Sequence, residues 1–364
     1  MWLVGSVTFL TALVLSVLGT WLMRRIAPRL GLIDHPAARK VHVVPTPLGG
    51  GVAIWIAVAL TVALAYLSAN LVHHSVGGSY DWFPESVRKN LPGMLGRASD
   101  VAWVLGLGTV VMLIGLVDDA RGLSYVLRLV IEVVLVVLLV FHGIRLTLLG
   151  PLSHPWVSGT ITVCWVVGLT NAFNFLDNMD GLSAGVAWIS AALFCVLMGL
   201  VGNYFVAGFL LAMMGALCGF LCFNWPPAKI FMGDAGSNFV GFMIGVITVV
   251  STFTNPNLPE ITIFAPLCVL AVPLYDSTTV ILIRLRQGRS PFKPDKSHFS
   301  HRLVALGMSS KQAVLTIYLV TLVSGLASLL LYPLVPAVRV FVVIALVVCV
   351  LGLVAVLESA GRKG

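Results

Sequence analysis

Acidic and amide side chains recur at short intervals in NAFNFLDNMDGLSA, residues 171–184. Asn171, Asn174 and Asp177 lie three residues apart, and Asp180 follows three further on. If the segment is helical, these side chains share one face. Such a row of oxygens can hold a hard cation or the edge of a nucleobase. The alternative is helix capping, although one cap requires only one such residue.

A second acidic group ends an apolar run in the segment GLVDDARGLS. Asp118 and Asp119 are adjacent carboxylates, and like charges side by side raise each other's pKa unless a cation intervenes. Such a pair suits metal binding or proton abstraction. Arg128 lies nine residues beyond Asp119 and could lie near a phosphate. Glu132, deeper in the next apolar run, requires a partner inside the bundle.

Two later segments carry further candidates. In FMGDAGS, Asp234 lies between glycines, so its backbone can approach a ligand closely. The alternative is that Asp234 is the N-cap of the next helix. In KPDKSHFSHRL, His298 and His301 share a face if the segment is helical, and Arg302 follows. The histidines could form a weak metal pair, but the surrounding Lys and Arg favour a phosphate. Asp276, inside an apolar run beside a helix-breaking Pro, is a candidate because intramembrane acids are usually functional.

A basic loop precedes the second apolar run, LIDHPAARKVHVVPTPLGGG. Lys40 and His42 could meet a phosphate, and the alternative is ordinary retention of basic residues on the cytoplasmic side. The glycines 49–51 allow close backbone approach to a ligand or a neighbouring helix.

The composition indicates an all-α, polytopic integral membrane protein. Only 10% of residues are charged and the mean hydropathy is +1.03. The net charge of +8 is better explained by cytoplasmic loops than by nucleic acid, which we do not expect as a partner. Eleven apolar runs suit membrane-crossing helices. They are approximately 2–22, 48–68, 101–117, 125–141, 157–175, 182–201, 204–222, 237–253, 260–283, 313–332 and 336–357.

The distribution of Lys and Arg predicts the orientation. With the N-terminus outside and the C-terminus cytoplasmic, 17 of the 22 basic residues lie on the cytoplasmic side. All polar motifs then fall on that face of a single transmembrane domain, residues 1–364. The loops expected to form the site are 23–47, 118–124, 171–181, 223–237 and 284–312.

The segments DDARGLS, NAFNFLDNMDGL, FMGDAGS and PDKSHFSHRL resemble those of the polyprenyl-phosphate N-acetylhexosamine-1-phosphate transferases, glycosyltransferase family 4. The resemblance extends from RKVHVVPTPLGG to the histidine segment. It implies transfer of a sugar-1-phosphate from a UDP-sugar to undecaprenyl phosphate, giving a diphospholipid and UMP, with Mg²⁺ or alternatively Mn²⁺. It further implies a multi-pass protein of the cell inner (plasma) membrane, with a cytoplasmic active site, that begins cell-envelope polysaccharide synthesis. A homodimer is left open.

The resemblance also assigns roles to the candidates. Asp118 and Asp119 match the paired acidic site, with Asp118 deprotonating the lipid phosphate or holding its approach. Asn174 and Asp234 match metal-ligand positions. By the same resemblance, the diphosphate is bound by His298, His301 and Arg302, and the two histidines are counted as catalytic. The nucleotide is bound by Asn171, Asp177 and Asp180. Substrate phosphates are bound by Lys40, His42 and Arg128.

Two departures from the family pattern bear on specificity. Ser300 replaces the middle His of the usual His-x-His-His, so that His is not essential here, and Arg128 stands where many relatives have Lys. The chain lacks the three adjacent His of the phospho-N-acetylmuramoyl-pentapeptide transferases, which remain an alternative, and is closer to the branch that uses UDP-N-acetylglucosamine. The alternative from another class is a multi-pass transporter of an anionic substrate, which predicts polar residues spread through the helices or an inverted repeat.

The charge distribution makes a testable prediction about topology. Asp295→Cys, introduced into a Cys-free background, should resist an impermeant thiol reagent in intact cells and react once the membrane is permeabilised. Labelling in intact cells would place the histidine segment outside and overturn the predicted orientation.

Overall fold

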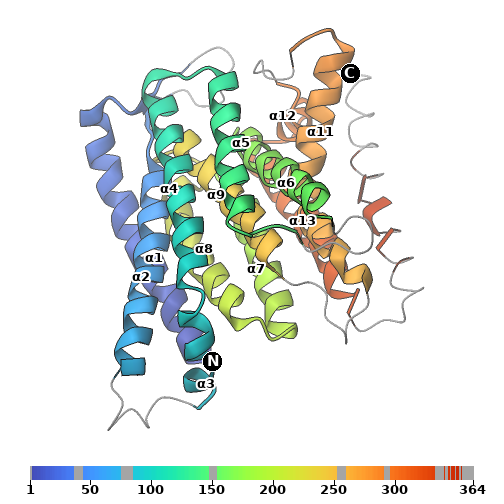
Figure 1. Cartoon of the computed structure of the whole chain (residues 1–364). Helices are drawn as coiled ribbons and strands as arrows, with labels where there is room; N and C mark the ends of the chain where they lie inside the picture. The colour runs from blue at the N-terminus through green and yellow to red at the C-terminus, as the bar shows by residue number, and fades with distance from the viewer. Residues whose placement is uncertain are drawn as a thin grey trace.

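The computed structural model describes residues 2–36, 44–74, 85–146, 154–251, 260–290 and 296–332, with scattered residues from 340 to 354. The fold in these ranges is a bundle of long helices (Figure 1). The only strands in these ranges, β1 (Ile33–Asp34) and β2 (Thr46–Pro47), form one short antiparallel pair in which Ile33 is opposite Pro47. The all-α prediction is therefore confirmed.

The first half of the chain contributes five α-helices and one short 3₁₀ helix in the described ranges. These are α1 (Trp2–Ile26), η1 (Ala27–Leu30), α2 (Gly50–His74), α3 (Glu85–Leu95), α4 (Ala98–Arg121) and α5 (Tyr125–Phe141). The N-terminus and α3 lie at the lower end of the bundle in Figure 1, and α12 lies at the upper end.

The second half supplies the core and the remaining elements. These are α6 (Pro155–Leu176), α7 (Leu182–Leu200), α8 (Tyr204–Asn224), α9 (Gly233–Val250), η3 (Glu260–Phe264), α10 (Ala265–Val269), α11 (Ala271–Arg286), α12 (Phe299–Ala305) and α13 (Ser310–Leu329). Helix α9 is buried without interruption from Ala235 to Val249 and packs against α2, α4, α6 and α7. Because a helix in this position is enclosed by other helices, a ligand can reach it only at its ends.

Eight described helices are long and apolar enough to cross a membrane, and the bent pair Ile261–Val269 and Ala271–Arg286 makes a ninth if it counts as one span. The protein is therefore polytopic, but the predicted number of eleven is not confirmed. The run 125–141 forms a helix of 17 residues, which is shorter than the other spans. The run 336–357 lies largely outside the described residues.

Glycines at the start of α2 allow its backbone to pack closely against the segment that leads into α9. Gly50 N donates to Phe231 O (3.0 Å) and Gly51 N donates to Met232 O (2.9 Å). A Cβ atom on Gly51 would lie 2.1 Å from Gly236 N. The expected close approach at the glycines 49–51 is thus to a neighbouring helix, and it fixes the start of α9 beside α2.

This contact yields a prediction about stability. Gly51→Ala places a methyl group inside the backbone of α9, so it should lower the free energy of unfolding by at least the ~1–3 kcal/mol typical of overpacking. The measurement is thermal unfolding in detergent. Gly106→Ala is the matched control because a Cβ at Gly106 has no neighbouring atom within 4 Å; equal stability of the two variants would contradict the packing argument.

Candidate active site

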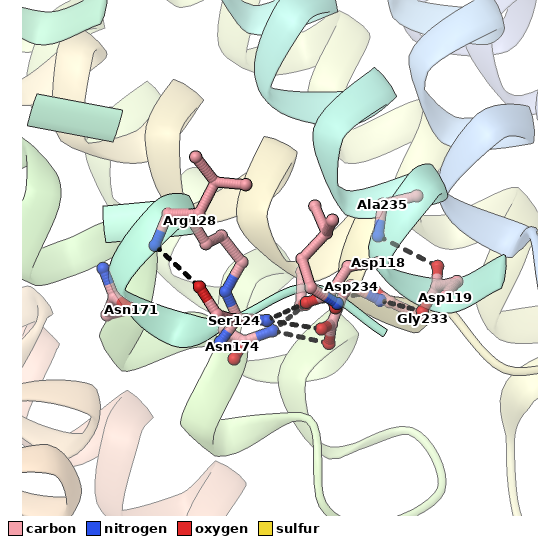
Figure 2. A network of polar contacts seen from close by, with 12 residues as sticks. Asp118, Asp119, Ser124, Arg128, Asn171, Asn174, Gly233, Asp234 and Ala235 are labelled. Atoms are coloured by element: carbon pink, nitrogen blue, oxygen red, sulfur yellow. Dashed lines mark hydrogen bonds and ion pairs between the residues drawn. The ribbon is translucent and has the colours of Figure 1, made fainter. Parts of the chain in front are cut away.

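An arginine bridges two of the predicted acids at one end of the bundle (Figure 2). Arg128 Nη1 contacts Asp118 Oδ2 and lies 2.6 Å from Asp234 Oδ2. These side chains come from α5, α4 and α9. Ser124 caps α5, accepting a hydrogen bond from Leu127 N, which sets the start of the helix that presents Arg128. The fold therefore brings Asp118, Arg128 and Asp234 into direct contact, whereas the sequence had placed Arg128 only near a substrate phosphate.

Asp119 binds the start of α9. Its Oδ1 accepts a hydrogen bond from Asp234 N (2.8 Å) and its Oδ2 accepts one from Ala235 N (3.1 Å). Gly233 has a φ of +72°, and a Cβ there would lie 2.5 Å from Asp119 Oδ2, so glycine is required for this approach. The two adjacent acids are not equivalent: Asp118 faces Arg128, whereas Asp119 caps a helix that lies far away in sequence.

The two asparagines of the polar row have different partners. Asn174 Nδ2 donates to Asp234 Oδ1 (2.8 Å) and Ser237 Oγ (3.0 Å), which places it in the acid cluster. Asn171 Nδ2 donates to Glu132 Oε2 (2.6 Å), the bundle partner that Glu132 requires. Glu132 is only 4% exposed, so this pair lies deeper along the helices than Asn174.

The predicted row does not continue along one helix. Helix α6 ends at Leu176, Asp177 follows as its C-cap, and Asp180 lies in the turn before α7. Asp180 Oδ2 accepts a hydrogen bond from Ala228 N (2.8 Å). The turn therefore brings Asp177 and Asp180 to the same end of the bundle as Asn174, and Asp180 ties it to the segment between α8 and α9.

Asn224 and Tyr318 hold this turn, and neither was predicted. Asn224, 3% exposed, accepts a hydrogen bond from Gly181 N (2.9 Å) and donates to Ile230 O (2.9 Å). Tyr318 Oη donates to Gly181 O. An amide at the end of an apolar run, directly before Trp-Pro-Pro, was the available signal for Asn224. No sequence signal connected Tyr318 with a turn so far away in the chain.

Asp177 lies in a field of negative charge. Its pKa is raised well above the usual carboxyl value, first by burial and then by Asp234, Asp119 and Asp180. Because burial and like charges both disfavour the ionised form, this side of the site favours a bound cation or a proton on Asp177.

The oxygen donors fit Mg²⁺ held together with substrate, and they do not form a complete metal centre. Mg²⁺ usually binds one or two carboxylates plus phosphate oxygens and water. The Asp234 side chain is 35% exposed, which leaves it accessible. No group of three His, Cys, Asp or Glu ligands occurs among the described residues. Asn174 presents Nδ2 to Asp234, so its amide must turn to offer oxygen.

The histidine segment lies against α11 and the α6–α7 turn. His298 is the N-cap of α12, and its ring centroid lies 6.3 Å from that of His301. Arg302 Nη2 donates to Thr279 Oγ1 (3.1 Å). Ser300 is 1% exposed and its Oγ donates to Asn178 Oδ1 (2.5 Å), so the residue that replaces the family's middle His joins this segment to the turn.

Two predicted residues, Lys40 and His42, fall outside the described residues, so their substrate contacts stay predictions. One cavity lies apart from this cluster. A largely apolar cavity of about 340 Å³ is lined by residues of α1, α2, α3, α4 and α8 and of the segments that precede α4 and α8, including Tyr66 and Arg97. It lies at the opposite end of the bundle from the acids, and it takes no part in the site.

Comparison with known proteins identifies relatives over most of the chain. A family model described as glycosyl transferase family 4 matches residues 101–252. A Bacillus subtilis protein named probable undecaprenyl-phosphate N-acetylglucosaminyl 1-phosphate transferase is 30% identical, over 89% of this chain and 84% of that protein. A Mycolicibacterium smegmatis decaprenyl-phosphate N-acetylglucosaminephosphotransferase is 33% identical, over 85% and 78%. The Escherichia coli K12 undecaprenyl-phosphate alpha-N-acetylglucosaminyl 1-phosphate transferase is 28% identical, over 86% and 80%.

The charge around Asp177 predicts a pH-dependent gain in stability. A carboxyl whose pKa is raised on folding costs stability as the pH rises from its unfolded value, ~4, through its folded value. Asp177→Asn should therefore raise the melting temperature by a few degrees at pH 7–8, without divalent cations, and by almost nothing near pH 4. Thermal unfolding across this range is the measurement. A gain independent of pH would show that charge is not the cause.

Proposed function

The chain belongs to glycosyl transferase family 4, and we propose that it transfers N-acetylglucosamine-1-phosphate from UDP-N-acetylglucosamine to undecaprenyl phosphate. UMP is the second product, and the diphospholipid begins cell-envelope polysaccharide synthesis. One observation carries this proposal: four helices bring Asp118, Arg128, Asn174 and Asp234 together at one end of an apolar bundle. A water-soluble nucleotide and a lipid phosphate can both reach such a place.

The proposed setting is the inner membrane, with this end of the bundle facing the cytoplasm. The distribution of Lys and Arg supports that orientation. The motif ends of α4, α6, α8 and α9 meet at one end, as the contacts of Asp119, Asn174 and Asn224 require. A single UDP-sugar in one compartment can therefore meet all of these motifs at once.

Phosphoryl transfer depends chiefly on positioning and on neutralising charge. An oxygen of the lipid phosphate forms a bond to the sugar-bearing phosphorus. The bond from that phosphorus to the bridging oxygen breaks, and the bridging oxygen leaves with UMP. The protein must therefore bring two anions together and accept any proton carried by the attacking phosphate.

Arg128 is the cation through which the acid cluster would receive a phosphate. It already contacts two carboxylate groups, and guanidinium binds phosphate oxygens in a similar geometry. A phosphate that takes one of these contacts leaves Asp118 free to accept a proton or to hold the approach of the acceptor. Leu123 N, which donates to Asp118 Oδ1, keeps the Asp118 carboxylate in place during this exchange.

Mg²⁺, or Mn²⁺ in its place, would be held by Asp234 and, after rotation of its amide, by Asn174. When bound, it supplies charge neutralisation at the diphosphate. Asp119 then serves to aim Asp234, because it fixes the backbone from which that side chain projects. We assign Asp177 and Asp180 to the nucleotide, and His298, His301 and Arg302 to the diphosphate. Asn171, also predicted at the nucleotide, is paired with Glu132 deeper in the bundle and holds that carboxylate instead.

The structure separates the two adjacent acids in a testable way. Asp118→Asn should insert normally and bind the UDP-sugar but lose ~100-fold in turnover, as removal of a general base typically does. Asp119→Asn should instead lower the melting temperature, because an amide cannot accept at both positions from Asp234 N and Ala235 N. UMP release measures turnover, and calorimetry measures donor binding.

Purified wild-type protein with undecaprenyl phosphate and a panel of UDP-sugars tests the reaction itself. The expected result is UMP release, together with a lipid diphosphate N-acetylhexosamine identified by mass spectrometry, with UDP-N-acetylglucosamine as the preferred donor. Donor binding without UMP release, for every sugar tested, would contradict the proposed function. Full turnover by Asp118→Asn would leave the reaction standing and remove Asp118 from its mechanism.

A further inference from the structure

Asp276 is a buried carboxylate that the acid cluster does not use. It lies in α11 and is 1% exposed. Its Oδ2 lies 2.8 Å from His298 Nδ1, and its Oδ1 accepts a hydrogen bond from Phe299 N (2.6 Å). Both oxygens are thus committed to the start of α12. A carboxylate inside an apolar bundle is costly unless it is paired, so this pairing accounts for its presence there.

The pairing determines how the His298 imidazole is oriented. Because Asp276 already accepts a backbone N–H, it acts as an acceptor, and the proton between the two side chains belongs on Nδ1. The other ring nitrogen, Nε2, makes no hydrogen bond within the part of the chain that the structure describes. A carboxylate that fixes one nitrogen of a histidine defines the tautomer and leaves the other nitrogen for a ligand.

Packing places the His298 ring at the end of α6 that carries Asn174. The ring meets Phe175 edge-on, with centroids 5.9 Å apart and planes at 75°. Phe175 directly follows Asn174, which contacts Asp234. Arg284, 2% exposed, lies 5.6 Å from the centroid of Phe175. His298 is therefore held at the end of α6 that also carries an asparagine of the site.

Two neighbours of Asp276 on α11 contact Phe299 and Arg302 of α12. Tyr275 packs edge-on against Phe299, with centroids 5.8 Å apart, and Thr279 accepts a hydrogen bond from Arg302. Little more than one turn of α11, from Tyr275 to Thr279, thus sets the position of a helix only seven residues long. A helix this short has little stability of its own, so its geometry depends on these contacts.

We propose that Asp276 is a positioning residue, which fixes the tautomer and ring orientation of His298 so that Nε2 faces the diphosphate of the UDP-sugar. This inference rests on the proposed function, because it takes His298 to contact the donor. Asp276 itself touches no substrate and acts through the imidazole.

Kinetics of single and double variants test the proposal. Asp276→Asn should lower turnover about tenfold to 100-fold, by analogy with the loss seen when the partner that orients a metal-ligating histidine is removed. In a His298→Ala background the same change should cost almost nothing further, because residues that act as a unit are not additive. Additive losses, or full turnover by Asp276→Asn, would overturn the proposal.

Nitrogen-15 NMR of histidine-labelled protein reads the tautomer directly, and the His298→Ala spectrum assigns the signal. The wild type should show His298 protonated at Nδ1, and this signal should change in Asp276→Asn. Asp276→Glu retains the charge but displaces the carboxylate, so it should recover part of the turnover; this variant keeps the test decisive if Asp276→Asn does not fold. An unchanged His298 signal in both variants would contradict the assigned contact.

A second acid–imidazole pair supplies the matched control. At the opposite end of the bundle His142 Nε2 lies 3.1 Å from Asp100 Oδ1, and the His142 ring stacks on Trp103. Asp100→Asn should leave UMP release and the His298 signal unchanged. If wild-type protein released no UMP, the proposed function would fail, whereas the NMR measurement would still decide whether Asp276 fixes His298.

Discussion

The structure depends on the hydrogen bonds by which Asp119 caps the first turn of α9. The amino end of a helix carries free N–H groups and partial positive charge, and a carboxylate there satisfies both. In this protein the carboxylate comes from α4, more than 100 residues earlier in the chain. The same contact turns Asp234 toward Arg128 and Asn174. Of two adjacent residues, Asp119 therefore forms a structural contact and Asp118 belongs to the proposed catalytic arrangement.

The long helices could be predicted because burial in lipid leaves apolar runs in the sequence, and the run 125–141 coincides with α5. The helix ends could not be predicted as well. Helix α9 begins at Gly233, four residues before its apolar run, because its cap comes from Asp119 and no local residue supplies one. The helix-breaking Pro beside Asp276 is Pro273. A break is observed in this run, but it lies at Leu270, between α10 and α11, with a bend of 68°.

The residue types of the site were predictable, but the division of roles among them was not. In sequence Asp118 and Asp119 are equivalent, and only the fold shows that one faces an arginine and the other faces backbone N–H groups. Asn171 and Asn174 likewise share a spacing, yet their partners are Glu132 and Asp234. These roles are decided by hydrogen-bond and ion-pair partners that lie far away in the sequence. The spacing of residues within one segment carries no information about such partners.

The balance of charge explains why substrate and cation should bind together. Asp118 and Asp234 share Arg128, whereas Asp177 faces three other carboxylates, which raise its pKa together with burial. A phosphate that approaches Arg128 withdraws a cation from these acids and leaves them less compensated. In the proposed reaction, a divalent cation would restore this balance, although the described residues alone do not complete its ligand set. The diphosphate and the metal would then each lower the electrostatic cost of binding the other, so the proposed function predicts that they bind cooperatively.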